Sequence, residues 1–192
     1  MPPTAAIAVS ESKRYVIVGT SGSGKSTFAQ SLAQHLGCAH VEMDSLFWGP
    51  DWESVGQKEF LRRVDAATQG DSWVADGNYT AAPPLLWGRA THIIWLNYSR
   101  PRTMARVLKR TLQRALTRKE LWSGNRESLR KSFFSKDSIL LWAHTSFARN
   151  RLKYTQLQAD PDYAHLKWIV FTHPSQTEAF LHATAPSRGT AG

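Results

Sequence analysis

Cysteine is almost absent from this chain: Cys38 is the only one among 192 residues. An internal disulfide is therefore impossible, and no CxxC pair or Cys/His cluster offers a zinc site. Long hydrophobic runs are also lacking, since none approaches the roughly 20 residues that cross a bilayer. Residues 1–12 carry neither the basic nor the apolar segment of a signal peptide. These absences predict a soluble protein of a reducing compartment, the cytoplasm.

Acidic residues are scarce relative to basic ones. The chain has 24 lysines and arginines against 15 aspartates and glutamates, which gives a net charge of +9. Most of the excess falls between residues 100 and 131, where only Glu120 and Glu127 oppose Arg100, Arg102, Arg106, Lys109, Arg110, Arg114, Arg118, Lys119, Arg126, Arg130 and Lys131. Such a segment suits an anionic partner, either a nucleic acid or a phosphorylated small molecule.

Short apolar runs alternate with stretches of helical periodicity along the chain. Strands are predicted over residues 14–18, 39–43, 72–75, 92–96 and 166–171. Helices are predicted from Phe28 up to Gly37, from Pro101 onward, and over residues 55–67, 138–157 and 176–182. This alternation predicts parallel βαβ units with right-handed crossovers. We expect an α/β fold with a five-stranded parallel sheet in a single domain, residues 1–183, followed by a disordered tail, 184–192.

The segment from Gly19 to Ser26 matches the phosphate-binding pattern GxxxxGK[ST], between a predicted strand and a predicted helix. Its glycines let successive N–H groups turn inward and form an anion site at the positive end of the helix dipole. We expect Lys25 to reach the β- and γ-phosphates, Ser26 to bind Mg²⁺ and Thr27 to contact the α-phosphate. An ordinary Gly/Ser-rich turn is the alternative. The predicted ATP-binding residues of this loop are Gly19, Ser21, Gly22, Ser23, Gly24, Lys25, Ser26 and Thr27.

No NKxD guanine signature accompanies the loop, which argues against a GTPase switch. A chain of this length also leaves no room for the extra modules of a helicase or a transporter ATPase. A small kinase is the class that remains.

Two aspartates follow predicted strands, where the carboxyl ends of parallel strands line a crevice. Asp44 follows the second strand, and could accept a proton from an acceptor hydroxyl or hold a metal-bound water; alternatively it caps a short helix beginning at Ser45. Asp76 follows the third strand and resembles the carboxylate that binds Mg²⁺ through water in phosphate-loop enzymes. An Asx turn is the alternative for Asp76.

The phosphoryl acceptor is expected near these aspartates. Trp48, with its aromatic neighbours, could form a wall for a ring or merely a hydrophobic cover. Asn78, Tyr79 and Arg89 lie downstream of Asp76 and are predicted acceptor-site residues.

Arg106 and Arg110 are four residues apart on the basic helix that begins at Pro101, so both project from one face. Arginine stacks on planar groups and forms bidentate hydrogen bonds with phosphates. The pair could clamp adenine and the transferring phosphoryl group, although most basic helix faces are merely solvated.

The chain resembles the small-molecule kinase branch of P-loop proteins, the adenylate kinase and shikimate kinase group. More closely, it resembles the compact bacterial proteins called adenylate-kinase-like ATPases or DNA topology modulation proteins. The resemblance rests on GTSGSGKST (19–27), MDSLFWGPDW (43–52), WVADGNY (73–79), HIIWLNYSRP (92–101) and RVLKR (106–110). It implies a three-layer P-loop NTPase fold with strand order 2-3-1-4-5, ATP with Mg²⁺, and a helical lid at about residues 117–136.

The resemblance also implies roles for single residues. Arg106 matches an arginine that stacks on adenine, Arg110 one that contacts phosphates, and the loop 172–175, with His173, a segment that borders adenine. The sequence departs from the pattern at Asn97, where many relatives carry an acid. It also lacks the adenylate kinase acceptor-site pattern, which argues against AMP.

These observations predict an ATP-dependent phosphotransferase for a nucleotide or another small metabolite, acting as a monomer or homodimer. Lys25, Asp44, Arg106, Arg110 and a lid arginine, Arg126, are its predicted catalytic residues, and Ser26 and Asp76 hold Mg²⁺. One rival is a nucleic-acid-binding ATPase or polynucleotide kinase, favoured by the positive charge. The other is a regulatory module that binds ATP without transferring phosphate.

Overall fold

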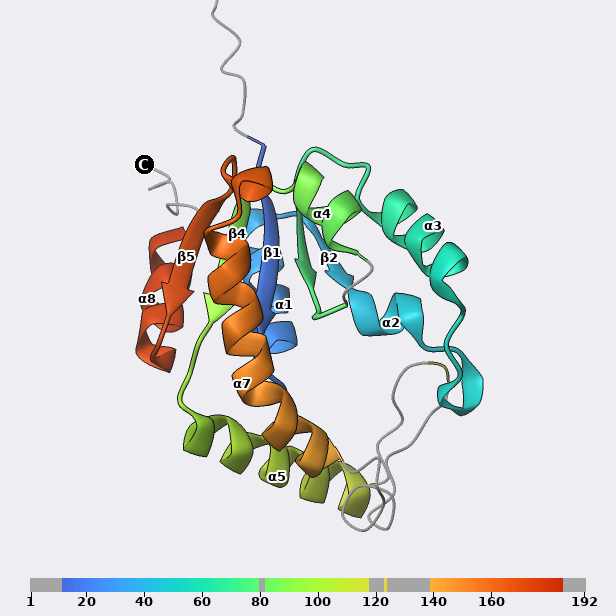
Figure 1. Ribbon diagram of the computed structural model, residues 1–192, viewed down its shortest axis with the longest axis vertical. Helices are drawn as coiled ribbons and strands as arrows, with labels where there is room; N and C mark the ends of the chain where they lie inside the picture. The colour runs from blue at the N-terminus through green and yellow to red at the C-terminus, as the bar shows by residue number, and fades with distance from the viewer. Residues whose placement is uncertain (1–11, 80–81, 118–122, 124–138, 185–192) are drawn as a thin grey trace, which may run out of the picture.

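The computed structural model describes residues 12–79, 82–117, 123 and 139–184, and Figure 1 shows their arrangement. The elements follow one another in the order β1 (Arg14–Gly19), α1 (Lys25–Leu36), β2 (Ala39–Glu42), α2 (Met43–Phe47), η1 (Pro50–Trp52), α3 (Gln57–Ala67), β3 (Trp73–Asp76), α4 (Pro83–Arg89), β4 (His92–Leu96), α5 (Arg100–Thr117), α7 (Ile139–Gln158), η3 (Pro161–Tyr163), β5 (Lys167–Phe171) and α8 (Pro174–Thr184).

The strands form one parallel sheet of five strands in the order β2-β3-β1-β4-β5. This arrangement confirms the predicted strand number, direction and order. At the centre, Val16 of β1 pairs with Ala75 of β3 on one side and with Ile93 of β4 on the other. The central strands are almost continuously buried, because a parallel sheet is covered by helices on both faces.

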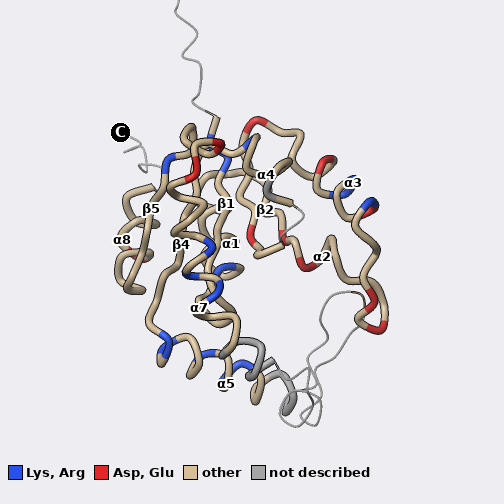
Figure 2. Tube along the Cα trace, in the orientation of Figure 1, with Lys and Arg blue, Asp and Glu red and all other residues tan. Residues whose placement is uncertain are grey.

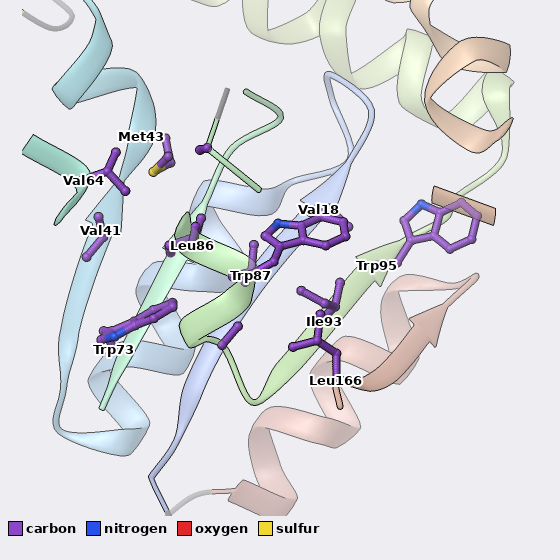
Figure 3. Close-up of a cluster of buried hydrophobic side chains, with 14 of the residues drawn as sticks. Val18, Val41, Met43, Val64, Trp73, Leu86, Trp87, Ile93, Trp95 and Leu166 are labelled. Carbon is purple, nitrogen blue, oxygen red and sulfur yellow. The ribbon is translucent and has the colours of Figure 1, made fainter. Parts of the chain in front are cut away.

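Side chains of β1 alternate between the two faces of the sheet, and each face has its own core. Ile17 packs against Phe28 and Leu32 of α1, on the face that α1 and α8 cover. Val16 and Val18 belong to the core on the opposite face, which α3, α4 and α7 supply with Val64, Trp87 and Tyr154 among others. Figure 3 shows part of this second core, with Trp73, Trp87 and Trp95 within it. The sheet is therefore the middle of three layers.

Helix α4 is an element that the sequence analysis did not predict. Two prolines open it, and proline is favoured in a first helical turn because its missing N–H has no partner there in any case. Leu86 and Trp87 are the buried residues that anchor this short helix to the sheet. A seven-residue helix has too few turns to show a periodicity, so its fold is decided by that packing.

Some predictions fall on segments outside the described residues. The predicted lid, 117–136, is described only at Thr117, the last residue of α5, and at Ser123. Arg126 and residues 185–192 of the predicted tail lie outside entirely, whereas Thr184 is the last residue of α8. Among the described helices, none combines the length and the apolar composition that a membrane span requires.

Candidate active site

The phosphate-binding loop joins the carboxyl end of β1 to the amino end of α1. Its backbone turns at Gly22 and Gly24, which have φ values of 79° and 91°. Gly24 is the N-cap of α1 and offers no side-chain cap to the first N–H groups of the helix. Those donors, together with the helix dipole, are therefore open to an anion. Of the side chains in this first turn, that of Thr27 is exposed.

Helix α5 packs against this loop at Gly22. A Cβ atom at position 22 would lie 2.4 Å from the carbonyl oxygen of Thr103 and 2.6 Å from a methyl carbon of Val107. Gly19 is similarly enclosed, since its Cβ would lie 2.7 Å from the carbonyl oxygen of Leu96. The glycines thus serve close packing of the loop on β4 and α5 as well as its backbone turns.

Lys25 begins α1 and folds back over the loop. Its Nζ donates a hydrogen bond to the carbonyl oxygen of Thr20 at 3.2 Å. Burial lowers the pKa of the Lys25 ammonium below its ordinary value, and the negative charges of Asp76 and Asp44 oppose this shift. Both predicted carboxylates are therefore close enough to Lys25 to act on its charge, which brings the three residues into one site.

Ser26 and Asp76 meet between α1 and β3. The Ser26 hydroxyl donates to Oδ2 of Asp76 at 2.6 Å, and Nε2 of His40 lies 2.8 Å from Oδ1 of the same carboxylate. Asp76 is only 4% exposed, so burial alone would disfavour its charge. These two contacts, together with the nearby Lys25, compensate the buried carboxylate.

The donor set suits Mg²⁺. Magnesium prefers oxygen ligands and is usually held by one or two carboxylates together with substrate phosphates and water. Ser26 and Asp76 present a hydroxyl and a carboxylate beside the phosphate loop. Within the described residues there is no cluster of three or more His, Cys, Asp or Glu side chains of the kind that binds a metal without a substrate. The predicted Mg²⁺ residues therefore fit such an ion bound together with a nucleotide.

The sequence suggested that Asp44 ends a strand, and the structure shows that it does not. Strand β2 stops at Glu42, and Asp44 is the second residue of the short helix α2. The alternative, that Asp44 caps a helix beginning at Ser45, is also wrong, because the N-cap of this helix is Glu42 and no side chain caps it. Asp44 still lies near the site, because its charge raises the pKa of Lys25 against the effect of burial.

Tyr79 holds the Asp44 carboxylate. Its hydroxyl donates to Oδ1 of Asp44 at 2.5 Å, and its ring packs against Phe47 and Phe60, with centroids 4.6 and 4.9 Å away. Burial, with the charge of Asp44 second, raises the pKa of Tyr79 above its ordinary value, so its proton stays on the phenol. Tyr79 thus orients Oδ1 of the Asp44 carboxylate.

Asn78, predicted as an acceptor ligand, is engaged by the protein at both ends of its amide. Its Nδ2 donates to the carbonyl oxygen of Gly19 at 2.6 Å, and its Oδ1 accepts from the hydroxyl of Tyr154 at 2.8 Å. The side chain connects the phosphate loop to α7. In this structure Asn78 contacts the phosphate loop, and its role toward an acceptor stays a prediction.

Arg89 lies away from the site. It closes α4, and its guanidinium donates to Oδ1 of Asp65 at 2.6 Å and to the hydroxyl of Thr68 at 3.1 Å. These partners belong to the end of α3, beside the amino end of β4, whereas the phosphate loop lies at the carboxyl edge of the sheet. The predicted acceptor role is therefore wrong, because Arg89 holds α3 to α4.

Trp48 follows α2 within a group of aromatic rings. Its centroid lies 4.8 Å from that of Phe47 and 5.8 Å from that of Trp52. Its backbone bridges to Ser54, and its carbonyl oxygen accepts from the hydroxyl of Ser123 at 2.9 Å. The ring is partly exposed, so both the wall and the cover that the sequence allowed are compatible with its place.

Arg106 and Arg110 both reach the phosphate loop from α5, as expected from their spacing. Arg106 donates to the carbonyl oxygen of Ser23 at 3.2 Å, and Arg110 donates to the hydroxyl of Ser21 at 3.3 Å. The Arg106 guanidinium also lies over the ring of Tyr98, 5.6 Å from its centroid. Two cations therefore border the loop on the side of α5.

His173 lies in the exposed turn between β5 and α8. The Gln176 side chain accepts hydrogen bonds from the backbone N–H groups of Thr172 and His173, at 2.8 and 3.0 Å, and so closes this turn. Because Phe171 pairs with Leu96, the turn stands at the same carboxyl edge of the sheet as the phosphate loop. The hydroxyl of Tyr98 lies 3.2 Å from that of Thr177 in α8.

Basic residues without acidic ones are found along two helices, α5 and α7. Helix α5 carries six lysines and arginines and α7 carries three, and the sequences of these two helices contain no acid. Figure 2 shows blue segments along α5 and α7, whereas α3 carries both blue and red segments. Helix α5 adjoins the phosphate loop through Arg106 and Arg110.

His40, Tyr154 and Tyr98 are site residues that the sequence did not identify. His40 and Tyr154 act through long-range contacts, 36 residues from Asp76 and 76 residues from Asn78. The motifs that the sequence analysis singled out include neither His40 nor Tyr154, and Tyr98 lies in the stretch 92–101 without a role assigned to it. The only sequence signal was weak: a histidine within a short predicted strand, 39–43.

Known proteins resemble this chain in structure more than in sequence. No protein-family model matches it, and no curated protein matches its sequence. Among solved structures, it is similar to the shikimate kinase from Bacteroides thetaiotaomicron, with a TM-score of 0.51 and 15% sequence identity. The match covers 89% of this chain and 95% of that one. With its strand order and its glycine-rich loop before α1, the chain has the three-layer α/β fold of P-loop kinases.

Proposed function

We propose that this protein is an ATP-dependent phosphotransferase whose acceptor is a hydroxyl group of a nucleotide or another small metabolite. The observation that carries the proposal is the Ser26–Asp76 pair, 2.6 Å apart, beside Lys25 at an uncapped helix N-terminus. Phosphoryl transfer depends on positioning and charge neutralisation, and this site supplies cations for a polyphosphate and a carboxylate for an acceptor. We also propose that the chain is related to the DNA topology modulation proteins that its sequence resembles.

The chain's own residues divide the work. The loop N–H groups and Lys25 hold the β- and γ-phosphates. Arg106 and Arg110 neutralise charge on the side of α5, with Arg106 and the turn at His173 beside adenine. Ser26 and Asp76 would hold Mg²⁺, which would supply positive charge against the phosphates.

Asp44 receives the acceptor proton. The acceptor oxygen forms a bond to the γ-phosphorus as the bond from that phosphorus to the bridging oxygen of ADP breaks, and the hydroxyl proton passes to the carboxylate. Tyr79 keeps that carboxylate in place. A base of this kind contributes about 10²–10⁴-fold to rate. Trp48, whose backbone N–H donates to the carbonyl oxygen of Asp44 at 3.0 Å, would line the acceptor side.

The domain division is part of the proposal. Residues 1–183 would form one domain, in which a lid at about 117–136 carries Arg126 over the phosphates and excludes water from the reaction. A cytoplasmic monomer or homodimer is the form in which we expect it to act.

A panel of nucleotides and hydroxylated metabolites, incubated with Mg²⁺ and radiolabelled ATP, tests the proposal. We expect transfer of the label to at least one acceptor, lost in Lys25→Met and reduced about 10²-fold or more in Asp44→Asn. ATP binding should survive in Asp44→Asn. Retained ATP binding with no transfer to any acceptor, unchanged by Asp44→Asn, would instead indicate a regulatory ATP-binding module.

A second candidate function, an ATPase or polynucleotide kinase that binds nucleic acid, is favoured by the acid-free sequences of α5 and α7. Binding of an oligonucleotide through these helices should weaken steeply as salt concentration rises. Replacing Arg149 and Arg151 with serine should weaken that binding and leave ATP affinity unchanged. A failure to bind oligonucleotides at low salt would remove this candidate.

A further inference from the structure

His40 contacts the site from the edge of the sheet. It lies on β2, where it is in register with Val74 of β3, two residues before Asp76. Side chains two positions apart on a strand share a face, so His40 and Asp76 lie on the same side of the sheet. Its Nε2 is 2.8 Å from Oδ1 of Asp76, and the imidazole is 21% exposed.

The two oxygens of the Asp76 carboxylate have different partners. Oδ2 accepts from the Ser26 hydroxyl at 2.6 Å, and a carboxylate oxygen is an acceptor only, so the imidazole must donate its Nε2 proton to Oδ1. A carboxylate torsion is broad and nearly two-fold. A donor on each oxygen therefore fixes both the plane of the carboxylate and the oxygen that faces Ser26.

We propose that His40 is a positioning residue for the divalent-cation site, which it orders by holding Asp76 against Ser26. This inference rests on the proposed function, because it concerns the ion that accompanies ATP. Partners that orient a metal-binding carboxylate change metal affinity by about 10–100-fold when removed. His40 belongs to no part of the phosphate-binding pattern.

A purely structural role predicts something different. If His40 only tied β2 to β3, its loss would lower stability and weaken nucleotide binding equally with and without Mg²⁺. Positioning of Asp76 predicts a loss confined to the Mg²⁺-dependent part of nucleotide affinity, because Lys25 and the loop amides do not contact His40.

Three variants separate these cases. His40→Leu removes the donor and keeps an apolar volume, whereas His40→Gln places an amide N–H at a similar reach. His35→Leu is the matched control, since His35 lies near the end of α1 and its Nδ1 contacts only the carbonyl oxygen of Ser31 among the described residues. The probe is a non-hydrolysable ATP analogue, titrated by calorimetry at a series of Mg²⁺ concentrations and in EDTA.

We expect the Mg²⁺ concentration for half-maximal stabilisation of analogue binding to rise about 10–100-fold in His40→Leu. Affinity in EDTA should stay at the wild-type value, and His40→Gln should restore most of the Mg²⁺ dependence. An unchanged Mg²⁺ dependence in His40→Leu, an equal loss in His40→Gln, or an equal loss in EDTA would each overturn the inference. A wild-type protein that binds no analogue under any condition would instead refute the proposed function.

The wild-type protein offers an independent measurement should His40→Leu fail to fold. In nitrogen NMR spectra of the analogue-loaded protein, added Mg²⁺ should shift the His40 Nε2 resonance and leave the His35 ring unchanged. A His40 resonance that does not respond to Mg²⁺ would contradict the inference.

Discussion

Replacing Gly22 with alanine tests whether α5 packs on the phosphate loop as closely as the structure has it. The substitution is expected to destabilise the folded protein in two ways. The residue has φ of 79°, which an L side chain rarely adopts, and the new Cβ would lie 2.4 Å from the carbonyl oxygen of Thr103. Alanine at Gly37 would have only the unfavourable backbone conformation, since φ there is 63° and nothing lies within 4 Å of its Cβ position. Comparing Gly22→Ala with Gly37→Ala therefore isolates the contact with α5.

The expected magnitudes follow from these two effects. A left-handed backbone costs about 1 kcal/mol for alanine, which is the whole effect expected in Gly37→Ala. Overpacking adds about 2 kcal/mol at Gly22, which gives about 3 kcal/mol in total. In a domain of this size 1 kcal/mol corresponds to about 2–4 °C, so the unfolding midpoint of Gly22→Ala should lie about 4–8 °C below that of Gly37→Ala.

Thermal unfolding followed by circular dichroism measures these differences. Gly88→Ala serves as the control, because Gly88 lies in α4 with no atom near its Cβ position. It should unfold at or slightly above the wild-type temperature, since alanine favours a helix by about 0.5–1 kcal/mol over glycine. If Gly22→Ala were no less stable than Gly37→Ala, the close packing of α5 on the loop would be refuted.

Three further outcomes are expected. Arg89→Met should lower the free energy of unfolding by about 1 kcal/mol or less, because the ion pair of Arg89 with Asp65 is partly exposed. The affinity for ATP should not change, and a large loss of this affinity in calorimetry would show that Arg89 belongs to the site after all. Tyr154→Phe leaves the Asn78 oxygen without its donor, and should cost about 1–3 kcal/mol in urea unfolding; an unaltered midpoint would argue against this link. Hydrogen bonds from two arginines lower the pKa of Glu59 to about 2. Any stability that this carboxylate contributes is therefore present above its ordinary pKa and is lost as the pH falls toward 2. An NMR titration that gives Glu59 an ordinary glutamate pKa would contradict the pairing.

The sequence predicted the phosphate loop because all of its residues are contiguous. Gly19, Gly24, Lys25 and Ser26 owe their roles to a strand, a turn and a helix that adjoin in the chain. Arg106 and Arg110 were also accessible, because a helical spacing of four places two side chains on one face. In each of these cases the pattern that made the prediction possible lies within a few neighbouring residues of the sequence.

The acceptor side was predicted less well. Asp44, Asn78 and Arg89 were grouped because they follow strands or lie near them in sequence. The structure places Asp44 in a helix, turns Asn78 toward Gly19 and Tyr154, and directs Arg89 to Asp65. The neighbouring residues in the sequence do not indicate which of several distant partners an amide or a guanidinium will contact.

The sequence by itself determined the alternation of strands and helices, the parallel sheet and the loop, because hydrophobic periodicity and glycine placement act over short stretches of chain. Only the tertiary structure decided which polar groups serve the site and which serve the scaffold. A buried polar side chain must find a hydrogen-bond partner, and that partner, as with His40 and Asp76, is fixed by the pairing of strands and the packing of helices.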